Sequence, residues 1–390
     1  MKSVKSKARR IAFFHLENWK NFRKVQIPLE RRTFIVGPNA SGKSNFLDAF
    51  RFLGDIVSVG GGFQEAVRKR GGVSSLRCLA AREYSDIVIE FGIGEEPGGD
   101  SWKYTLKFNQ DNLRRPNVKQ ETVVGPGDKT ILSRPDELDR SDPERLTQTF
   151  LEQVNVNREF REIGDFLKSI RYLHLVPQLI REPDRSVGRH NDPYGGDFLE
   201  QVARTPEKTR RARLRKILNA LRVAVPQLSE LILEQDKRGI WHLKGKYEHW
   251  RPQGAWQTEE QFSDGTLRLL GFLWAVLDGN GPLLLEEPEL SLHPEVVMFL
   301  PQLLARVQRR TGRQVIMSTH SKDLLSDTGI GLDEVLLMTP GAEGTAVDLA
   351  ASLKDARILL DHGQSMAEVV IPRTRPQDAA QLTLALDYGQ

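Results

Sequence analysis

A short glycine-bounded segment limits the folds open to this chain: Gly37-Pro38-Asn39-Ala40-Ser41-Gly42-Lys43-Ser44. It fits the P-loop pattern, in which a lysine and a hydroxyl residue follow the second glycine. The apolar run Thr33–Val36 before the loop predicts a buried strand, and the apolar residues of Asn45–Leu53 after it have helical spacing. A strand, a loop of this kind and a helix in that order are typical of α/β folds with a parallel sheet.

The segment from Gly37 to Asn45 predicts a phosphate-binding site. Glycines let backbone N–H groups come close to phosphate oxygens, and the following helix directs the positive end of its dipole toward them. We expect Lys43 to reach the outer phosphates of a nucleotide and Ser44 to bind Mg²⁺ through its hydroxyl.

A pair of acidic residues follows a second predicted strand. Leu283–Leu285 form a short apolar run, and Glu286 and Glu287 come directly after it. Ligands of open parallel sheets bind at the carboxyl ends of the strands. Because adjacent residues on a strand point to opposite faces, the two carboxylates should have different roles. We expect Glu286 to hold the metal ion and Glu287 to activate the attacking water as a general base.

Two further segments carry weaker signals. Ser263-Asp264-Gly265 precedes a helix predicted at 266–277, where the serine is either part of an anion site or an ordinary N-cap. His320 follows a strand predicted at 314–319, and an isolated histidine there has a structural explanation as well. The order of P-loop, Ser-x-Gly turn, acidic strand end and histidine favours one shared site.

In this order the motifs resemble those of an ABC-type ATPase head of the RecF/SMC-like class, which includes the OLD-like predicted ATPases. In that resemblance Ser263–Gly265 corresponds to the signature turn, Glu286-Glu287 to Walker B and His320 to the switch histidine. The similarity covers about residues 10–80 and 255–340. It implies ATP and Mg²⁺ as cofactors, and catalytic roles for Lys43, Glu287 and His320.

The resemblance also implies a homodimer or higher oligomer built from heads that associate head to tail. Ser263 and Gly265 would then complete the ATP site of the partner subunit. The family has a Q-loop glutamine after an apolar strand, and Gln178 is the candidate here. The chain departs from transporter ATPases because its signature reads Ser-Asp-Gly-Thr, and Glu286 stands where the family has an aspartate.

We predict an α/β fold with a mixed or parallel core sheet, an antiparallel β lobe and an inserted helical subdomain. Alternating helix and strand between Thr266 and Met338 is typical of a parallel sheet with crossover helices. The expected divisions are the first part of the core, the β lobe, the mostly helical insert, the second part of the core and a tail: 1–80, 81–138, 139–235, 236–345 and 346–390. Coiled-coil arms and a C-terminal nuclease domain are not expected.

Composition bears on the partners. The longest apolar run, Leu269–Leu277, is too short to cross a membrane, and a single cysteine, Cys78, rules out an internal disulfide and favours the cytoplasm. Basic residues gather at the start of the chain and on one side of the helix predicted at 207–221. They are Lys2, Lys5, Lys7, Arg9 and Arg10, then Lys208, Arg211, Arg213, Arg215 and Lys216.

These basic residues make duplex DNA a candidate partner, because lysine and arginine bind phosphates independently of sequence. A solvated charged face explains them as well. Three hypotheses remain open: an ATP-driven dimeric switch in DNA maintenance or foreign-DNA sensing, a regulatory ATPase that holds or releases a separately encoded effector protein of a defence system, and a soluble transporter subunit.

Overall fold

The computed structural model describes residues 8–82, 84–95, 101–182, 192–249 and 255–374. The described chain forms a six-stranded core sheet, a second six-stranded sheet and a three-stranded sheet. Among the helices described, none is long and apolar enough to cross a membrane.

The core sheet has the strand order β15-β14-β3-β13-β12-β8. Its neighbours pair in parallel, except that β15 is antiparallel to β14. The strands are β3 (Arg32–Val36), β8 (Arg171–Leu173), β12 (Leu283–Glu286), β13 (Val315–Thr319), β14 (Val335–Gly341) and β15 (Gly344–Leu349). The predicted α/β class with a mixed core sheet is confirmed.

The second sheet is antiparallel throughout, in the order β2-β1-β4-β5-β6-β7. Its strands are β1 (Arg10–Trp19), β2 (Phe22–Pro28), β4 (Ile87–Gly94), β5 (Trp102–Gln110), β6 (Pro116–Gly125) and β7 (Lys129–Arg134). The first two strands, expected as part of the core, thus share a sheet with the β lobe. The predicted division at residue 80 stays a prediction.

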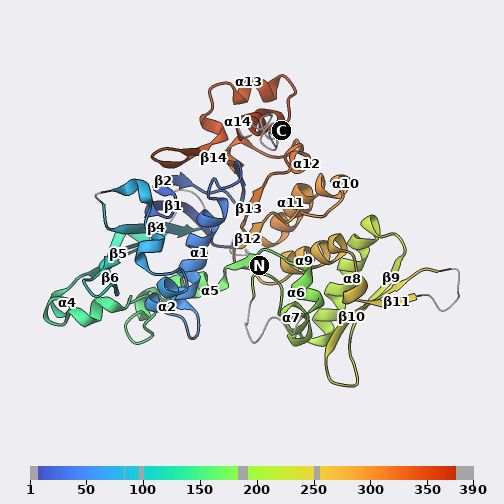
Figure 1. The fold of residues 1–390 in the computed structure, drawn as a ribbon, viewed down its shortest axis with the longest axis horizontal. Coiled ribbons are helices and arrows are strands. Elements are labelled where there is room, and N and C mark those ends of the chain that lie inside the picture. Colours follow the sequence, from blue (N-terminus) through green and yellow to red (C-terminus); the bar gives the residue numbers. More distant parts are fainter. Residues whose placement is uncertain (1–7, 83, 96–100, 183–191, 250–254, 375–390) are drawn as a thin grey trace, which may run out of the picture.

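The third sheet belongs to a lobe with three helices, α6 (Pro177–Arg181), α7 (Phe198–Arg204) and α8 (Glu207–Ala224). Its strands β9 (Leu228–Gln235), β10 (Trp241–Tyr247) and β11 (Ala255–Thr258) are antiparallel. Figure 1 shows this green and yellow lobe on the opposite side of the core strands from the blue β lobe. The range 139–235, expected to be mostly helical, therefore also supplies β8 to the core sheet and β9 to this one.

Apolar residues of the core strands alternate between two hydrophobic clusters, one on each face of the sheet. Ile35, Leu284 and Ile316 pack on the side of α1 (Lys43–Val57) and the antiparallel sheet. Phe34, Leu285 and Met317 pack on the side of α9 (Asp264–Leu277) and α11 (Leu300–Thr311). Helix α1 is thus held between two sheets, which fixes the loop that precedes it.

The remaining helices are short: α2 (Phe63–Arg68), α3 (Val73–Leu76), α4 (Glu137–Ser141), α5 (Arg161–Ser169), α10 (Pro294–Val297), α12 (Lys322–Leu325), α13 (Ala356–Asp361) and α14 (Met366–Thr374). The alternation of helix and strand between Thr266 and Met338 predicts one helix over 294–310, and this is wrong, because the structure divides the segment into α10 and α11. Proline disfavours helical backbone in the residue before it, so Pro301 suits the first turn of a new helix.

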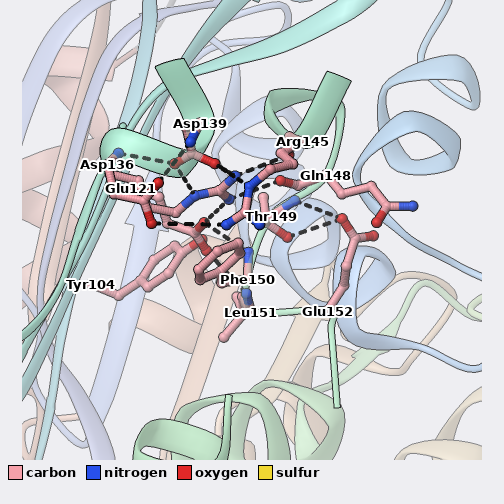
Figure 2. A network of polar contacts seen from close by, with 11 residues as sticks. Tyr104, Glu121, Asp136, Asp139, Arg145, Gln148, Thr149, Phe150, Leu151 and Glu152 are labelled. Carbon is pink, nitrogen blue, oxygen red and sulfur yellow. Dashed lines mark hydrogen bonds and ion pairs between the residues drawn. The ribbon is translucent and has the colours of Figure 1, made fainter. Parts of the chain in front are cut away.

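A fully buried arginine joins the β lobe to the segment that follows it. The Arg134 guanidinium lies 3.0 Å from Glu121 and 2.9 Å from Asp139, and the three side chains have no exposed surface. Glu121 also accepts hydrogen bonds from the Phe150 and Leu151 amides, at 2.7 and 3.0 Å. Figure 2 shows Glu121 and Asp139 converging with the backbone of residues 148–151. The network ties this segment to the edge of the antiparallel sheet.

Candidate nucleotide-binding site

The P-loop connects the central strand β3 to α1. Gly42 has φ of 95°, a left-handed conformation that glycine adopts without strain. A Cβ at this position would lie 2.0 Å from Asn21 Nδ2, so only glycine fits between Asn21 and the loop. The strand, loop and helix order predicted for this segment is the one observed.

The loop presents donors suited to an anion. The N-cap of α1 is Gly42, which has no side chain that could cap the first turn of the helix. The amides of that turn are therefore not occupied by an N-cap side chain and can bind an anion. Lys43 is buried, and its Nζ donates to the carbonyls of Gly37 and Pro38, at 3.0 Å each. Burial lowers the pKa of Lys43, and the nearby carboxylates of Glu287 and Glu286 oppose this effect. The donor set fits a polyphosphate.

Glu286, the last residue of β12, contacts two hydroxyl groups. Ser44 Oγ donates to Glu286 Oε1, and the Tyr172 hydroxyl donates to Glu286 Oε2. Burial raises the pKa of Tyr172, so this hydroxyl is a donor at neutral pH. Ser44 and Glu286 offer oxygen ligands of the kind Mg²⁺ prefers. The described chain contains no self-contained cluster of three acidic, histidine or cysteine ligands, so an ion here would also need phosphate and water oxygens.

Glu287 faces a different partner. His320 follows β13, and its Nε2 lies 3.1 Å from Glu287 Oε1. This hydrogen bond lowers the pKa of Glu287, so the carboxylate is ionised at neutral pH. The predicted reason for the separate roles was wrong, because Glu287 lies beyond the strand with φ of 44°. A left-handed residue after β12, and not the pleat of the strand, turns the second carboxylate toward His320.

Glu289 begins the segment that corresponds to the D-loop in the resemblance, but no role of its own was predicted for its side chain. Only 8% of its surface is exposed, and burial raises its pKa. Its Oε1 accepts hydrogen bonds from Thr319 Oγ1 at 2.5 Å and from the His320 amide at 3.2 Å. Glu289 therefore fixes the backbone that carries His320. The sequence shows Glu289 as the third acidic residue of Glu-Glu-Pro-Glu, which could have marked it as a candidate site residue. Its burial, however, cannot be predicted from the sequence.

Asn21 was also missed. It lies in the turn between β1 and β2, and its Nδ2 donates to the Ser41 carbonyl at 2.9 Å and to Thr345 Oγ1 at 2.8 Å. Its Oδ1 accepts from Asn45 Nδ2 at 2.8 Å. Asn21 thus joins the P-loop, the start of α1 and the edge strand β15.

The signature turn lies at the start of α9. Ser263 Oγ accepts a hydrogen bond from the Thr266 amide at 3.2 Å, so Ser263 is the N-cap of α9, one of the two roles expected for it. A Cβ at Gly265 would lie 2.6 Å from the Ser291 carbonyl, so the close approach of these segments requires glycine. Within the described ranges no hydrogen bond joins Ser263 or Gly265 to the P-loop. Their predicted role in a partner's site stays a prediction.

Gln178 lies in α6, and its Oε1 accepts a hydrogen bond from Arg181 at 2.6 Å. Arg181 in turn lies 2.6 Å from Asp264 in the signature turn. The glutamine is therefore linked to that turn, and a Q-loop role for it stays a prediction.

The basic face of α8 is narrower than predicted. Lys208, Arg211, Arg215 and Lys216 are exposed, and Arg211 also pairs with Glu207 at 2.5 Å. Arg213 does not belong to this face, because its guanidinium lies 2.6 Å from Asp278 and over the Trp274 ring. At the start of the chain, Lys2, Lys5 and Lys7 lie outside the described residues. Arg9 pairs with Glu162, and Arg10 is buried.

The fold and this arrangement of motifs define a RecF/SMC-like ABC-type ATPase head. The chain belongs to the family described as "AAA domain, putative AbiEii toxin, Type IV TA system", whose model matches residues 32–327.

The chain is also 30% identical, over 157 residues, to the DNA replication and repair protein RecF of Synechococcus sp. (strain JA-3-3Ab). The match spans 40% of this chain and 39% of that relative.

Two solved SMC heads have a similar fold. One is an SmcHead bound to the C-winged helix domain of ScpA, with a TM-score of 0.54, 15% identity and coverage of 87% of this chain and 97% of that one. The other is a head domain with an extended coiled coil, bound to the C-terminal domain of ScpA derived from Pyrococcus furiosus. Its TM-score is 0.51 at 14% identity, covering 91% of this chain and 100% of that one. At these identities the similarity establishes the fold alone.

Proposed function

We propose that this chain binds ATP with Mg²⁺ at the P-loop and hydrolyses it, with Glu287 as the general base. The observation that carries the proposal is the meeting of two carboxylates with different partners at one edge of the core sheet. Glu286 contacts Ser44 of the P-loop, and Glu287 contacts His320. These contacts support a metal-binding role for Glu286 and the role of general base for Glu287.

Each group of residues has a separate role in this proposal. The P-loop amides and Lys43 bind the phosphates, and Ser44 with Glu286 holds Mg²⁺, which neutralises charge that develops on the phosphate oxygens. Glu287 accepts a proton from the attacking water, and His320 orients the carboxylate through their hydrogen bond.

The chain acts as a dimer in this proposal. Ser263 is exposed and has no hydrogen bond to the P-loop of its own chain within the described residues. Its hydroxyl contacts the amide and the hydroxyl of Thr266, so a second copy would have to share or replace these contacts. A head-to-tail dimer brings Ser263 and Gly265 of one subunit against the nucleotide of the other. ATP then closes the dimer, and hydrolysis opens it.

Duplex DNA is the partner we propose for the closed state. The curated relative is named a DNA replication and repair protein, and the exposed Lys208, Arg215 and Lys216 of α8 are residues of the type that binds phosphates, which supports the proposal. The net charge of +4 agrees with a polyanion partner.

The test is phosphate release from ATP by wild type and Lys43→Ala, with Mg²⁺ or with EDTA, and with or without duplex DNA. We expect Mg²⁺-dependent turnover that DNA increases and that Lys43→Ala abolishes. Turnover that survives Lys43→Ala would refute the assignment of the P-loop.

A second candidate function is regulation of a separate effector protein by the ATP state. The description of the family, which names a toxin of a type IV TA system, favours this alternative. DNA-independent turnover together with ATP-dependent binding of a protein encoded beside this chain would replace the DNA proposal.

A further inference from the structure

The signature turn carries a negative charge where the proposed dimer would place a phosphate. Asp264 lies between Ser263 and Gly265, and 51% of its side chain is exposed. Asp264 is the first residue of α9, so its carboxylate interacts with the positive end of the helix dipole and would repel an anion that approaches the same end. We propose that Arg181 is a positioning residue that neutralises Asp264 and thereby allows the signature turn to accept the triphosphate bound by the partner subunit. The inference rests on the head-to-tail dimer of the proposed function.

Arg181 contacts both residues that flank Ser263. One guanidinium nitrogen, Nη2, lies 2.6 Å from Asp264 Oδ1 and donates to the Phe262 carbonyl at 2.7 Å. Within the part of the chain that the structure describes, this is the ion pair that Asp264 makes. The guanidinium therefore neutralises the carboxylate and also fixes the backbone on either side of Ser263.

Arg181 is placed by packing that does not involve the ion pair. It ends α6, and the neighbouring Ile180 is buried in the same hydrophobic cluster as the apolar residues of α9. A Cβ at Gly271 of α9 would lie 2.5 Å from Leu175 Cδ1, so the segment that leads into α6 packs closely on α9. Arg181 Nη1 also donates to Gln178 Oε1 at 2.6 Å. A change of charge at Arg181 should therefore leave α6 and α9 packed together.

A second cation near the turn does not replace Arg181. Arg268 lies one helical turn further along α9, at the i+4 position from Asp264. Burial lowers the pKa of Arg268, and the carboxylates of Asp264 and Glu287 oppose this effect. The single charge of Arg268 is thus shared by two carboxylates, whereas Arg181 is joined to Asp264 by a direct hydrogen bond. Loss of Arg181 should therefore leave net negative charge at the signature turn.

The experiment measures, by analytical ultracentrifugation, the association of two copies of the chain saturated with Mg²⁺ and a slowly hydrolysed ATP analogue. It compares wild type with Arg181→Gln, which removes the charge, and with Arg181→Lys, which retains it. The matched control Arg204→Gln removes an exposed arginine that pairs with Glu200 on α7. We expect Arg181→Gln to raise the dimer dissociation constant at least about tenfold, because the carboxylate then repels the phosphate. Arg181→Lys and Arg204→Gln should stay within about threefold of wild type.

Rescue by a second substitution separates charge from structure. Asp264→Asn removes the carboxylate, so Arg181→Gln combined with Asp264→Asn restores the balance of charge that the ion pair provides. We expect this double variant to regain the dimer affinity of wild type to within about threefold. The affinity of the monomer for the analogue, measured at protein concentrations too low for dimers, should be the same in all variants because the P-loop is unchanged.

Two results would overturn the inference. One is a wild-type dimer affinity in Arg181→Gln, and the other is a double variant that associates as weakly as Arg181→Gln. Failure of wild type to form a dimer with the analogue would instead refute the proposed head-to-tail dimer, and the inference with it.

Discussion

His320 Nε2 lies 3.1 Å from Glu287 Oε1, at the carboxyl ends of two neighbouring parallel strands, β13 and β12. The two residues reach each other from separate chain segments, and each is fixed independently. Glu289 holds the His320 amide, and the Glu287 amide donates to the Ser318 carbonyl at 3.1 Å. The contact is therefore a property of the sheet edge, and it supports a base whose orientation is set before nucleotide binds.

Replacing His320 by alanine should slow hydrolysis and change its pH dependence. His320 lowers the pKa of Glu287, whereas burial opposes this effect, so loss of the histidine should raise that pKa. A general base works only when it is unprotonated, so the acid limb of the kcat profile should move to higher pH, and kcat should fall at least about tenfold. Steady-state kinetics from about pH 3 to about pH 8, a range that extends below the usual glutamate value of 4.5, provide the measurement, with the exposed His362→Ala as control. An unshifted acid limb would argue against the role of His320.

Asn21→Ala should weaken nucleotide binding without unfolding the chain. The substitution removes hydrogen bonds to the Ser41 carbonyl and from Asn45, which hold the P-loop against the β1–β2 turn. The expected cost is about 1–2 kcal/mol, or roughly a tenfold higher dissociation constant for ATP. Calorimetric titration would measure this, and Asn112→Ala at an exposed position serves as the control. Equal affinity in the two variants would contradict the assigned role.

The basic face of α8 should determine the salt dependence of DNA binding. Changing Lys208, Arg215 and Lys216 to alanine should lower affinity for duplexes of any sequence and reduce the salt slope by up to about 3. Alanine at Lys119 and Lys129 of the β lobe and at Arg140 of α4, all three exposed, removes the same charge elsewhere. If both triple variants bind DNA equally, this face is not the contact surface.

The buried network in the β lobe should dominate stability there (Figure 2). Arg134→Ala leaves Glu121 buried without its cation and Asp139 with only the partly exposed Arg145, at a cost of about 3–5 kcal/mol in the free energy of unfolding. Urea titration measures this cost, and the exposed Arg140→Ala should change little. A cost below about 1 kcal/mol would show that the network contributes little.

Acid should weaken the same network. Burial would raise the pKa of Asp139, but hydrogen bonds from Arg134, the Asp136 amide and Arg145 hold it well below its usual value of 3.8. This depressed pKa stabilises the folded state above pH 3.8, and the contribution is lost as the pH falls below that value. Asp139→Asn should therefore flatten the decline of stability below about pH 4. An unchanged acid decline in this variant would contradict the assignment.

The parts of the site that depend on local pattern could be predicted from the sequence. The apolar runs before Gly37, Glu286 and His320 predicted the buried strands β3, β12 and β13, since continuous apolar runs bounded by polar residues are typical of such strands. The glycine spacing of the P-loop likewise predicted where the following helix begins.

The parts that depend on distant chain segments could not. The sequence predicts an apolar strand at Ile170–Val176, before Gln178, but only Arg171–Leu173 forms β8, because these residues pair with the edge of β12. The contact of Tyr172 follows from the register of β8 with β12, which are far apart in sequence. Asn21 lies in a hairpin turn, and its hydrogen bonds reach Ser41, Asn45 and Thr345 in other parts of the chain. The left-handed conformation of Glu287 is likewise imposed by the packing after β12, since glutamate does not favour it.

The most direct test of the central claim is ATP turnover and ATP-dependent oligomer size for wild type and Glu287→Gln. Glutamine keeps the shape of the side chain but cannot accept the proton, so we predict that hydrolysis falls at least about 100-fold. The variant should still bind ATP, and it should accumulate as a dimer that wild type forms only transiently. Normal turnover by Glu287→Gln would contradict the account, because the base would then be another residue.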